Sequence, residues 1–280
     1  MRNCIAFFVC VMVVSARTYW HRSRNAGKRI THVFYHPVTP EWDKLSVTWM
    51  KWDEIPLTVS DAVAKGWSLR DKCQARAYFQ GRRYIRNGDL TLMLLFDAND
   101  KIAGIQTGIP TSTVCKRMGS PWKRENDSYV VTAYFKDPSL ICSHRYDSKA
   151  KYFGDRLLIQ KSSKANGFVQ VPLLERGLLG GMWTKGECFW SMGKMYWYDL
   201  LNVFDCNSLF PVFVMYTNGV LNGFGWILPF KLDNPRFVHP TNVSFPYLFK
   251  RDTIPACFWT ADHLSMMHVY LDSNPFFNIC

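Results

Sequence analysis

The sequence predicts an α+β fold, rich in strands, made of two tandem diverged repeats related by a pseudo-twofold axis. Each repeat is expected to be a short helix packed on a curved antiparallel β-meander. The first observation is a hairpin pattern that occurs twice, as LLFDANDKIAGIQTGIP (94–110) and FVMYTNGVLNGFGWILP (213–229). The second is a Pro-Leu pair upstream of each hairpin, whose proline precedes a Trp by eleven residues and is followed by a Cys. The third is a Tyr…Pro…Cys run that closes each unit, at Cys142 and Cys280.

The chain begins with a predicted signal peptide, residues 1–16. A positive start is followed by an apolar run over 4–14 and by small residues before position 17. This run is shorter than the roughly 20 residues that cross a bilayer, and no later stretch is long and apolar enough. We therefore expect a secreted, extracellular protein without a transmembrane anchor. Residues 17–45 form a basic leader or short propeptide, in which Gly27-Lys28-Arg29 resembles a processing site.

The first repeat unit is expected to span residues 46–142. A weak alternation predicts a strand at 46–50, and Thr58, Ser60 and Gly66 predict the start and end of a helix over 58–65. The remaining apolar runs predict strands, which are 75–79, 91–96, 102–109 and 129–135.

A connector, 143–168, precedes the second unit, 169–280, and contains that unit's leading strand at 156–160. The helix expected over 173–181 is weak because it contains three glycines. Asn218-Gly219 between two apolar runs predicts a tight hairpin. The two units are expected to pack as one globular body.

Seven of the nine cysteines follow the signal peptide, and most should pair in an oxidising compartment. Their positions favour three pairs, Cys115 with Cys142, Cys257 with Cys280 and Cys188 with Cys206. Cys73 is then left, either as a buried or interchain thiol or as a reactive nucleophile. Asn126 and Asn242 each begin an Asn-x-Ser sequence and are predicted glycosylation sites.

The formal net charge is +12, with Lys and Arg dense in 21–29, 70–86 and 116–124. Outside the cell this excess favours acidic glycans or anionic surfaces as partners, although a solvated basic surface needs none. No nucleic-acid-binding motif occurs, so nucleic acid is not an expected partner.

The sequence contains no standard catalytic motif from which a reaction could be inferred. It also assigns no cofactor. The second repeat nevertheless differs from the first in ionisable residues: His268 stands where the first has Thr132. An extracellular enzyme, an oxidoreductase or hydrolase, could use His263, His268 and Asp262. A metal ion, if there is one, would be bound by His239, His263 and His268. The alternative is that these are surface histidines plus one strand histidine hydrogen-bonded to a neighbour.

Aromatic residues make up 16% of the chain and crowd the stretch 188–201, which is either a packed strand pair or the wall of a pocket. We expect first a protein that binds a hydrophobic or aromatic small molecule, between sheet and helix or at the seam of the repeats. The predicted lining residues are Trp190, Tyr196, Tyr198, Phe224, Trp226 and Gln106. The matched hairpins differ most where Gly225 and Trp226 replace Gln106 and Thr107. The enzyme, and a matrix or mucus protein that binds acidic glycans, remain the alternatives.

Overall fold

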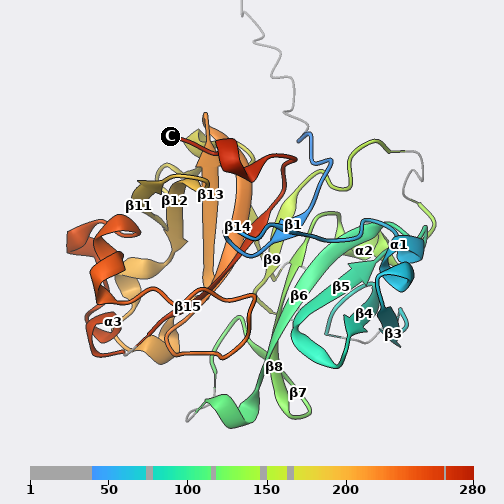
Figure 1. Cartoon of the computed structure of the whole chain (residues 1–280), viewed down its shortest axis with the longest axis horizontal. Coiled ribbons are helices and arrows are strands. Elements are labelled where there is room, and N and C mark those ends of the chain that lie inside the picture. Colours follow the sequence, from blue (N-terminus) through green and yellow to red (C-terminus); the bar gives the residue numbers. More distant parts are fainter. Residues whose placement is uncertain (1–39, 74–77, 115–117, 146–149, 163–166, 262) are drawn as a thin grey trace, which may run out of the picture. The chain divides into compact units, whose positions relative to one another are not determined.

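The computed structural model describes residues 40–73, 78–114, 118–145, 150–162, 167–261 and 263–280. The predicted signal peptide and nearly all of the basic leader lie outside the described residues. The fold is β-rich, with two antiparallel sheets and few short helices (Figure 1), which confirms that part of the prediction. The α-helices in the described part are α1 (Val59–Ala64), α2 (Pro138–Ile141) and α3 (Ala256–Thr260). None of the described helices is long and apolar enough to cross a membrane.

The first sheet has the strand order β10-β9-β8-β6-β5-β4-β3, and β7 pairs with β8 beside this path. Its strands are β3 (Trp67–Asp71), β4 (Arg82–Arg86), β5 (Asp89–Phe96), β6 (Ile102–Pro110), β7 (Lys123–Glu125), β8 (Ser128–Tyr134), β9 (Leu157–Gln160) and β10 (Phe168–Val171). Most of the strand predicted over 75–79 lies outside the described residues. The other strands predicted for the first repeat form within one or two residues of their expected bounds, except that the one predicted at 46–50 is β1 (Ser46–Val47).

The second sheet has the order β11-β12-β13-β14-β15-β1-β2. Its remaining strands are β2 (Asp53–Glu54), β11 (Trp183–Phe189), β12 (Gly193–Tyr198), β13 (Val212–Thr217), β14 (Val220–Leu228) and β15 (Ser265–Tyr270). The predicted tight turn joins β13 to β14, with Asn218 and Gly219 both at positive φ (52° and 77°). This is the geometry that Asn-Gly favours between twisted strands.

Each sheet is completed by a two-stranded hairpin. In the sequence, the hairpin that completes one sheet comes before the meander of the other sheet. The hairpin β1–β2 pairs with β15, where Ser46 lies opposite Tyr270. The hairpin β9–β10 pairs with β8, where Leu158 lies opposite Tyr134. Neither five-stranded meander therefore carries its own leading hairpin.

The two predicted helices have different outcomes. Helix α1 forms as expected, because the Thr58 side chain accepts a hydrogen bond from the Asp61 amide and Gly66 follows at φ 81°. The helix predicted over 173–181 is wrong: only a single 3-10 turn, η2 (Glu175–Leu178), forms there. The glycines in that segment give the unfolded chain more conformational entropy. A longer helix would lose this entropy on forming and is therefore less stable.

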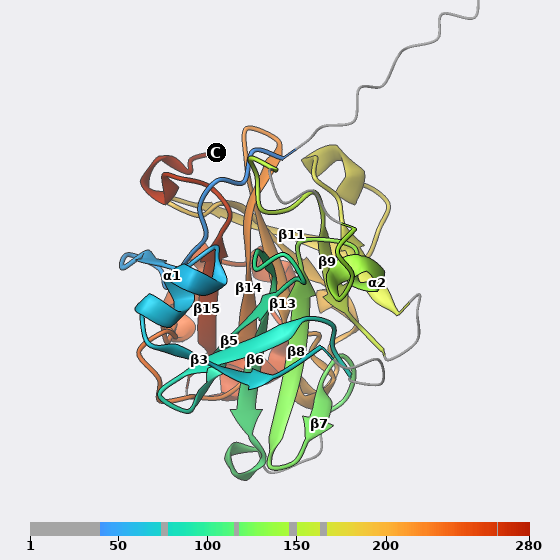
Figure 2. The ribbon, with the colours of Figure 1, turned by 90° about the vertical axis from the view of Figure 1, so that its right-hand side faces the viewer.

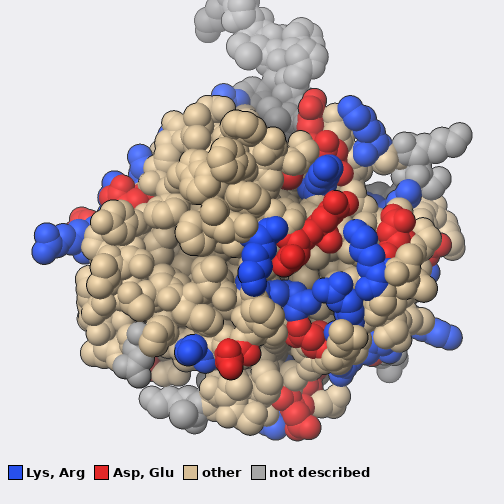
Figure 3. All heavy atoms as spheres, viewed as in Figure 1, with Lys and Arg blue, Asp and Glu red and all other residues tan. Residues whose placement is uncertain are grey.

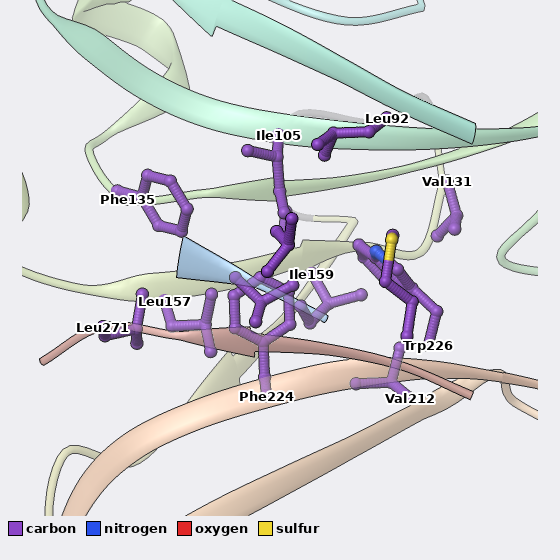
Figure 4. Close-up of a cluster of buried hydrophobic side chains, with 14 of the residues drawn as sticks. Leu92, Ile105, Val131, Phe135, Leu157, Ile159, Val212, Phe224, Trp226 and Leu271 are labelled. Carbon is purple, nitrogen blue, oxygen red and sulfur yellow. The ribbon is translucent and has the colours of Figure 1, made fainter. Parts of the chain in front are cut away.

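The core lies between the two sheets, not between a helix and a sheet. Viewed from the side of the first sheet, β5, β6 and β8 stand in front of β13, β14 and β15 (Figure 2). Figure 4 shows Ile105 and Val131 of the first sheet facing Phe224 and Trp226 of the second. These four side chains are at most 1% exposed, so the seam is filled by packed side chains.

The disulfides differ from the pairing that the sequence favoured. The structure joins Cys73 with Cys142, Cys188 with Cys280 and Cys206 with Cys257. Cys73 is therefore not a free thiol, and Cys115 lies outside the described residues. The predicted pairing failed because it joined cysteines that are close in the sequence, whereas the meander brings the segment after β3 next to α2.

Candidate functional site

The aromatic residues predicted to line a pocket are mostly part of the packed interior. Phe224 and Trp226 are fully buried between the sheets, and Tyr196 and Tyr198 belong to the same cluster. The Tyr196 hydroxyl donates a hydrogen bond of 2.7 Å to Glu175. Trp190 is 42% exposed and lies edge-on to Phe276, with ring centroids 4.9 Å apart. The structure does not bring these residues together around one cavity.

Gln106 is the centre of a buried polar group on the outer face of the first sheet. Its side-chain oxygen accepts a hydrogen bond of 2.7 Å from Arg83, and its amide nitrogen donates one of 2.8 Å to Thr132. Arg83 also pairs with Asp71 at 2.7 Å and with Glu125 at 2.6 Å. Each of these side chains has at least one partner, and of their buried atoms only Glu125 Oε1 has none among the described residues, so the arrangement is that of a structural network.

The histidines proposed for catalysis or metal binding separate into two sets. Asp262 lies outside the described residues, and His263, only partly buried, does not line the cavity described below. His239 and His268, in contrast, line one cavity together. Among the described residues, no group of three or more His, Cys, Asp or Glu side chains is placed to hold a metal ion.

This cavity, called the His268 cavity below, has a volume of about 570 Å³. It lies on the face of the second sheet that points away from the first. Along β15, Met267 and Val269 point into the core between the sheets, whereas Met266 and His268 belong to the opposite face. The segment 238–248, which includes the 3-10 turns of η5 (Asn242–Tyr247), covers that face. The lining consists of Trp49, Phe189, Met192, Val238, His239, Pro240, Ser244, Tyr247, Leu248, Met266 and His268.

The β1–β2 hairpin supplies the aromatic wall of the His268 cavity. Thr48, Met50 and Trp52 all have positive φ (72°, 65° and 47°), a conformation that non-glycine residues rarely adopt. This tight turn holds Trp49 over the cavity, where its indole N–H donates a hydrogen bond of 2.9 Å to Ser191. The Thr48 amide donates to the backbone carbonyl of His268, so the hairpin is fixed to the strand beneath it. Backbone strain of this kind often accompanies binding sites.

His268 is the unusual residue of the cavity. It is fully buried, and neither ring nitrogen has a hydrogen-bond partner among the described residues. Burial lowers the pKa of His268 to about 3, so the imidazole is neutral at physiological pH. A neutral imidazole has one donor and one acceptor nitrogen, and neither is bonded to a described residue.

His239 presents one polar atom to the same space. The Ser265 hydroxyl donates its hydrogen to the Phe230 carbonyl, so His239 Nδ1 must donate to Ser265 Oγ, 3.1 Å away. In the neutral form of the ring, this hydrogen bond places the proton on Nδ1 and leaves Nε2 as an acceptor. None of the described residues that line the cavity is an Asp, Glu, Lys or Arg.

Comparisons with protein-family models, with curated proteins and with solved structures found no match to this chain. Sequence reasoning found His239 and His268 but missed Trp49, Met192, Val238 and Met266 as lining residues. The segment 238–248 has no helical or strand periodicity, so no sequence signal shows that it folds over β15.

Proposed function

We propose that this protein binds a hydrophobic small molecule in the His268 cavity. The observation that carries the proposal is a fully buried histidine, without a partner among the described residues, in an otherwise apolar cavity of about 570 Å³. A buried polar group without a partner costs about 1–3 kcal/mol of stability. Small-molecule sites typically measure about 300–1,000 Å³, with apolar walls and a few polar groups. A bound ligand would offset the cost of burying His268.

The surface charges support a neutral ligand. On the face drawn in Figure 3, Lys and Arg mix with Asp and Glu over the first sheet, on the right. On the left side, where β11, β12 and α3 lie, the charged residues stand mainly along the rim, and the area inside it is mostly uncharged. The positive charge of the chain is thus partly compensated on this face by neighbouring acids, which favours a small-molecule site over a glycan-binding surface as the main function.

Titration with N-phenyl-1-naphthylamine, an uncharged probe whose fluorescence rises in apolar sites, tests the proposal. The protein should bind it saturably. Val238, which lines the cavity and pairs with Met266, can be changed to Trp to fill the space. V238W should weaken binding at least tenfold. V63W is the matched control, because Val63 is 56% exposed on α1. Absence of saturable binding, or equal binding by V238W and wild type, would overturn the proposal.

We further propose that the protein is secreted and glycosylated. The three disulfides found among the described residues fit an oxidising compartment. Asn126 and Asn242 are both exposed, so an oligosaccharide could be attached at either without disturbing the core. Mass spectrometry of the protein secreted by a eukaryotic host, before and after enzymatic deglycosylation, tests this. An unprocessed amino terminus with no mass change would count against it.

We also propose that residues 46–142 and 169–280 are diverged copies of one unit, related by a pseudo-twofold axis. Gly104 lies opposite Tyr134, and Gly223 lies opposite Tyr270. In the first unit the Ile102 amide donates a hydrogen bond to the Leu57 carbonyl, which lies upstream of the meander. In the second unit the Leu221 amide donates in the same way to the Leu173 carbonyl. These pairs join the residues that the sequence comparison had matched, and chance would not place the same contacts at the same steps.

A further inference from the structure

We infer that the ligand of the His268 cavity carries a hydroxyl group on an apolar skeleton, and that this hydroxyl hydrogen-bonds to the His268 imidazole. The inference rests on the proposed function, and it names the chemical class of the ligand: a neutral alcohol or phenol.

The first sheet shows how the same strand position is satisfied without a ligand. Gln106 on β6 lies opposite Thr132 on β8 and donates a hydrogen bond of 2.8 Å to its hydroxyl. The corresponding pair in the second sheet, by register from Gly104 and Gly223, is Gly225 and His268. In the first sheet, β6 therefore supplies a side-chain partner to Thr132. In the second sheet, β14 supplies none to His268.

Packing around Gly225 prevents the neighbouring strand from supplying a partner. A Cβ atom at this position would meet Phe213 Cζ at 2.2 Å and the Met267 carbonyl oxygen at 2.4 Å. The Phe213 ring lies edge-on to His268, with centroids 5.1 Å apart, and the Tyr270 ring stacks at 6.3 Å. On the other side, Thr48 bonds only the backbone carbonyl of His268. No described side chain or backbone group therefore bonds the ring nitrogens, and the open space that His268 borders is the cavity.

The charge state of the cavity selects a hydroxyl over an ion. His268 is neutral, and the described lining residues include no acid, Lys or Arg. A carboxylate or an ammonium group would therefore enter without a counter-charge, which costs far more than burying a neutral group. A hydroxyl donates one hydrogen bond and accepts another, so it fits either tautomer of the imidazole.

Three probes with one skeleton test the inference: naphthalene, 2-naphthol and 2-naphthoate, measured by equilibrium dialysis against wild type, H268F and H268N. We expect 2-naphthol to bind wild type about three to ten times more tightly than naphthalene, the value of one added hydrogen bond. H268F should bind 2-naphthol no more tightly than naphthalene. H268N keeps a donor and an acceptor and should retain part of the preference.

The outcomes separate the two proposals. If neither naphthalene nor 2-naphthol binds, and the N-phenyl-1-naphthylamine titration also fails, the apolar site itself is wrong. If naphthalene and 2-naphthol bind equally well, and H268F changes neither, the site stands and the inference about the hydroxyl is overturned. If 2-naphthoate binds most tightly, the ligand class is an acid and the inference is again overturned. Circular dichroism of both variants shows that they are folded.

Discussion

Gly225 lies directly opposite His268 in the register of β14 and β15. The consequence is a fully buried imidazole beside a residue that has no side chain to offer it. In the first sheet, Gln106 stands opposite Thr132 and bonds it. Thr132 and His268 thus occupy corresponding positions in the two sheets, but only Thr132 has a hydrogen-bond partner on the neighbouring strand. Replacing the two residues should therefore change the free energy of unfolding in opposite directions.

Removing the unpaired imidazole should stabilise the protein. H268F keeps a ring of similar size and removes two buried nitrogen atoms that lack partners, so the free energy of unfolding should rise by about 1–3 kcal/mol at pH 7. T132V is the matched change, and loss of the Gln106 hydrogen bond should lower stability by about 0.5–1.5 kcal/mol. Urea denaturation of the ligand-free protein measures both. A destabilised H268F variant would show that His268 has a partner in the folded protein.

The stability of the protein should depend on pH through His268. The pKa of His268 is about 3 in the folded protein and about 6.5 in the unfolded chain, so the unfolded chain binds more protons between these values. Stability is therefore lost as the pH falls below about 6.5, by up to about 1.4 kcal/mol per pH unit.

Burial has the opposite effect on Asp272, whose pKa it raises to about 6, so that group stabilises the fold as the pH falls. The difference between wild type and H268F cancels the Asp272 contribution, because both proteins contain it. Between pH 6 and pH 4 the difference in unfolding free energy should grow by about 1.4 kcal/mol per unit. A constant difference would contradict the burial of a neutral imidazole.

The ion pair of Lys136 and Asp97 should be essential to the first sheet. Asp97 is fully buried, and Lys136 Nζ lies 2.6 Å from its carboxylate. K136M should lower the free energy of unfolding by about 3–5 kcal/mol, because it leaves a buried charge without its counter-ion. The double variant D97N/K136M should recover part of this loss. R156M removes a pair of similar length, 2.8 Å, at an exposed site and should change stability by less than about 1 kcal/mol.

Gly225 should tolerate no side chain. The contacts at 2.2 Å and 2.4 Å predict that G225A displaces Phe213 or the β15 backbone and lowers stability by about 1–3 kcal/mol. G119A is the control, since an added Cβ there would meet only the Asn207 carbonyl oxygen, at 3.9 Å. Thermal denaturation of the two variants, compared with wild type, distinguishes crowding from a general effect of replacing glycine.

Peptide mapping without reduction should find the three disulfides of the structure, Cys73–Cys142 among them. Replacing this pair by alanine should lower stability by about 2–5 kcal/mol, because it releases a loop with a sequence separation of 69 residues. Recovery of a Cys115–Cys142 or Cys188–Cys206 peptide would instead favour the pairing predicted from the sequence.

The sequence predicted the local parts of this fold well. The hairpin at Asn218 and Gly219, and the helix that starts at Thr58, depend on neighbouring residues, whose chemistry can be read from a few positions. The pairing of β1 with β15 could not be predicted in this way, because it joins residues more than two hundred positions apart. The same holds for the sheet-on-sheet core, where Phe224 and Trp226 were expected to line a pocket and are instead packed.

The candidate site was predicted only in its chemistry. Comparison of the two hairpins singled out Gly225, and comparison of the last strands singled out His268. That these residues lie opposite each other depends on strand register, and the cavity depends on how the segment 238–248 crosses β15. Both are tertiary features, and neither has a periodic pattern in the sequence.

The pairing of β1 with β15 also has a consequence for the order in which the sheets form. β15 (Ser265–Tyr270) follows β1 (Ser46–Val47) by more than two hundred positions in the sequence. The hairpin that opens the described fold must therefore wait for the final strand before it can pair, and so must the turn that places Trp49. A contact this long in sequence favours slow folding. We expect the first sheet, whose strands lie within residues 67–171, to form before the second sheet, and with it the His268 cavity, is completed.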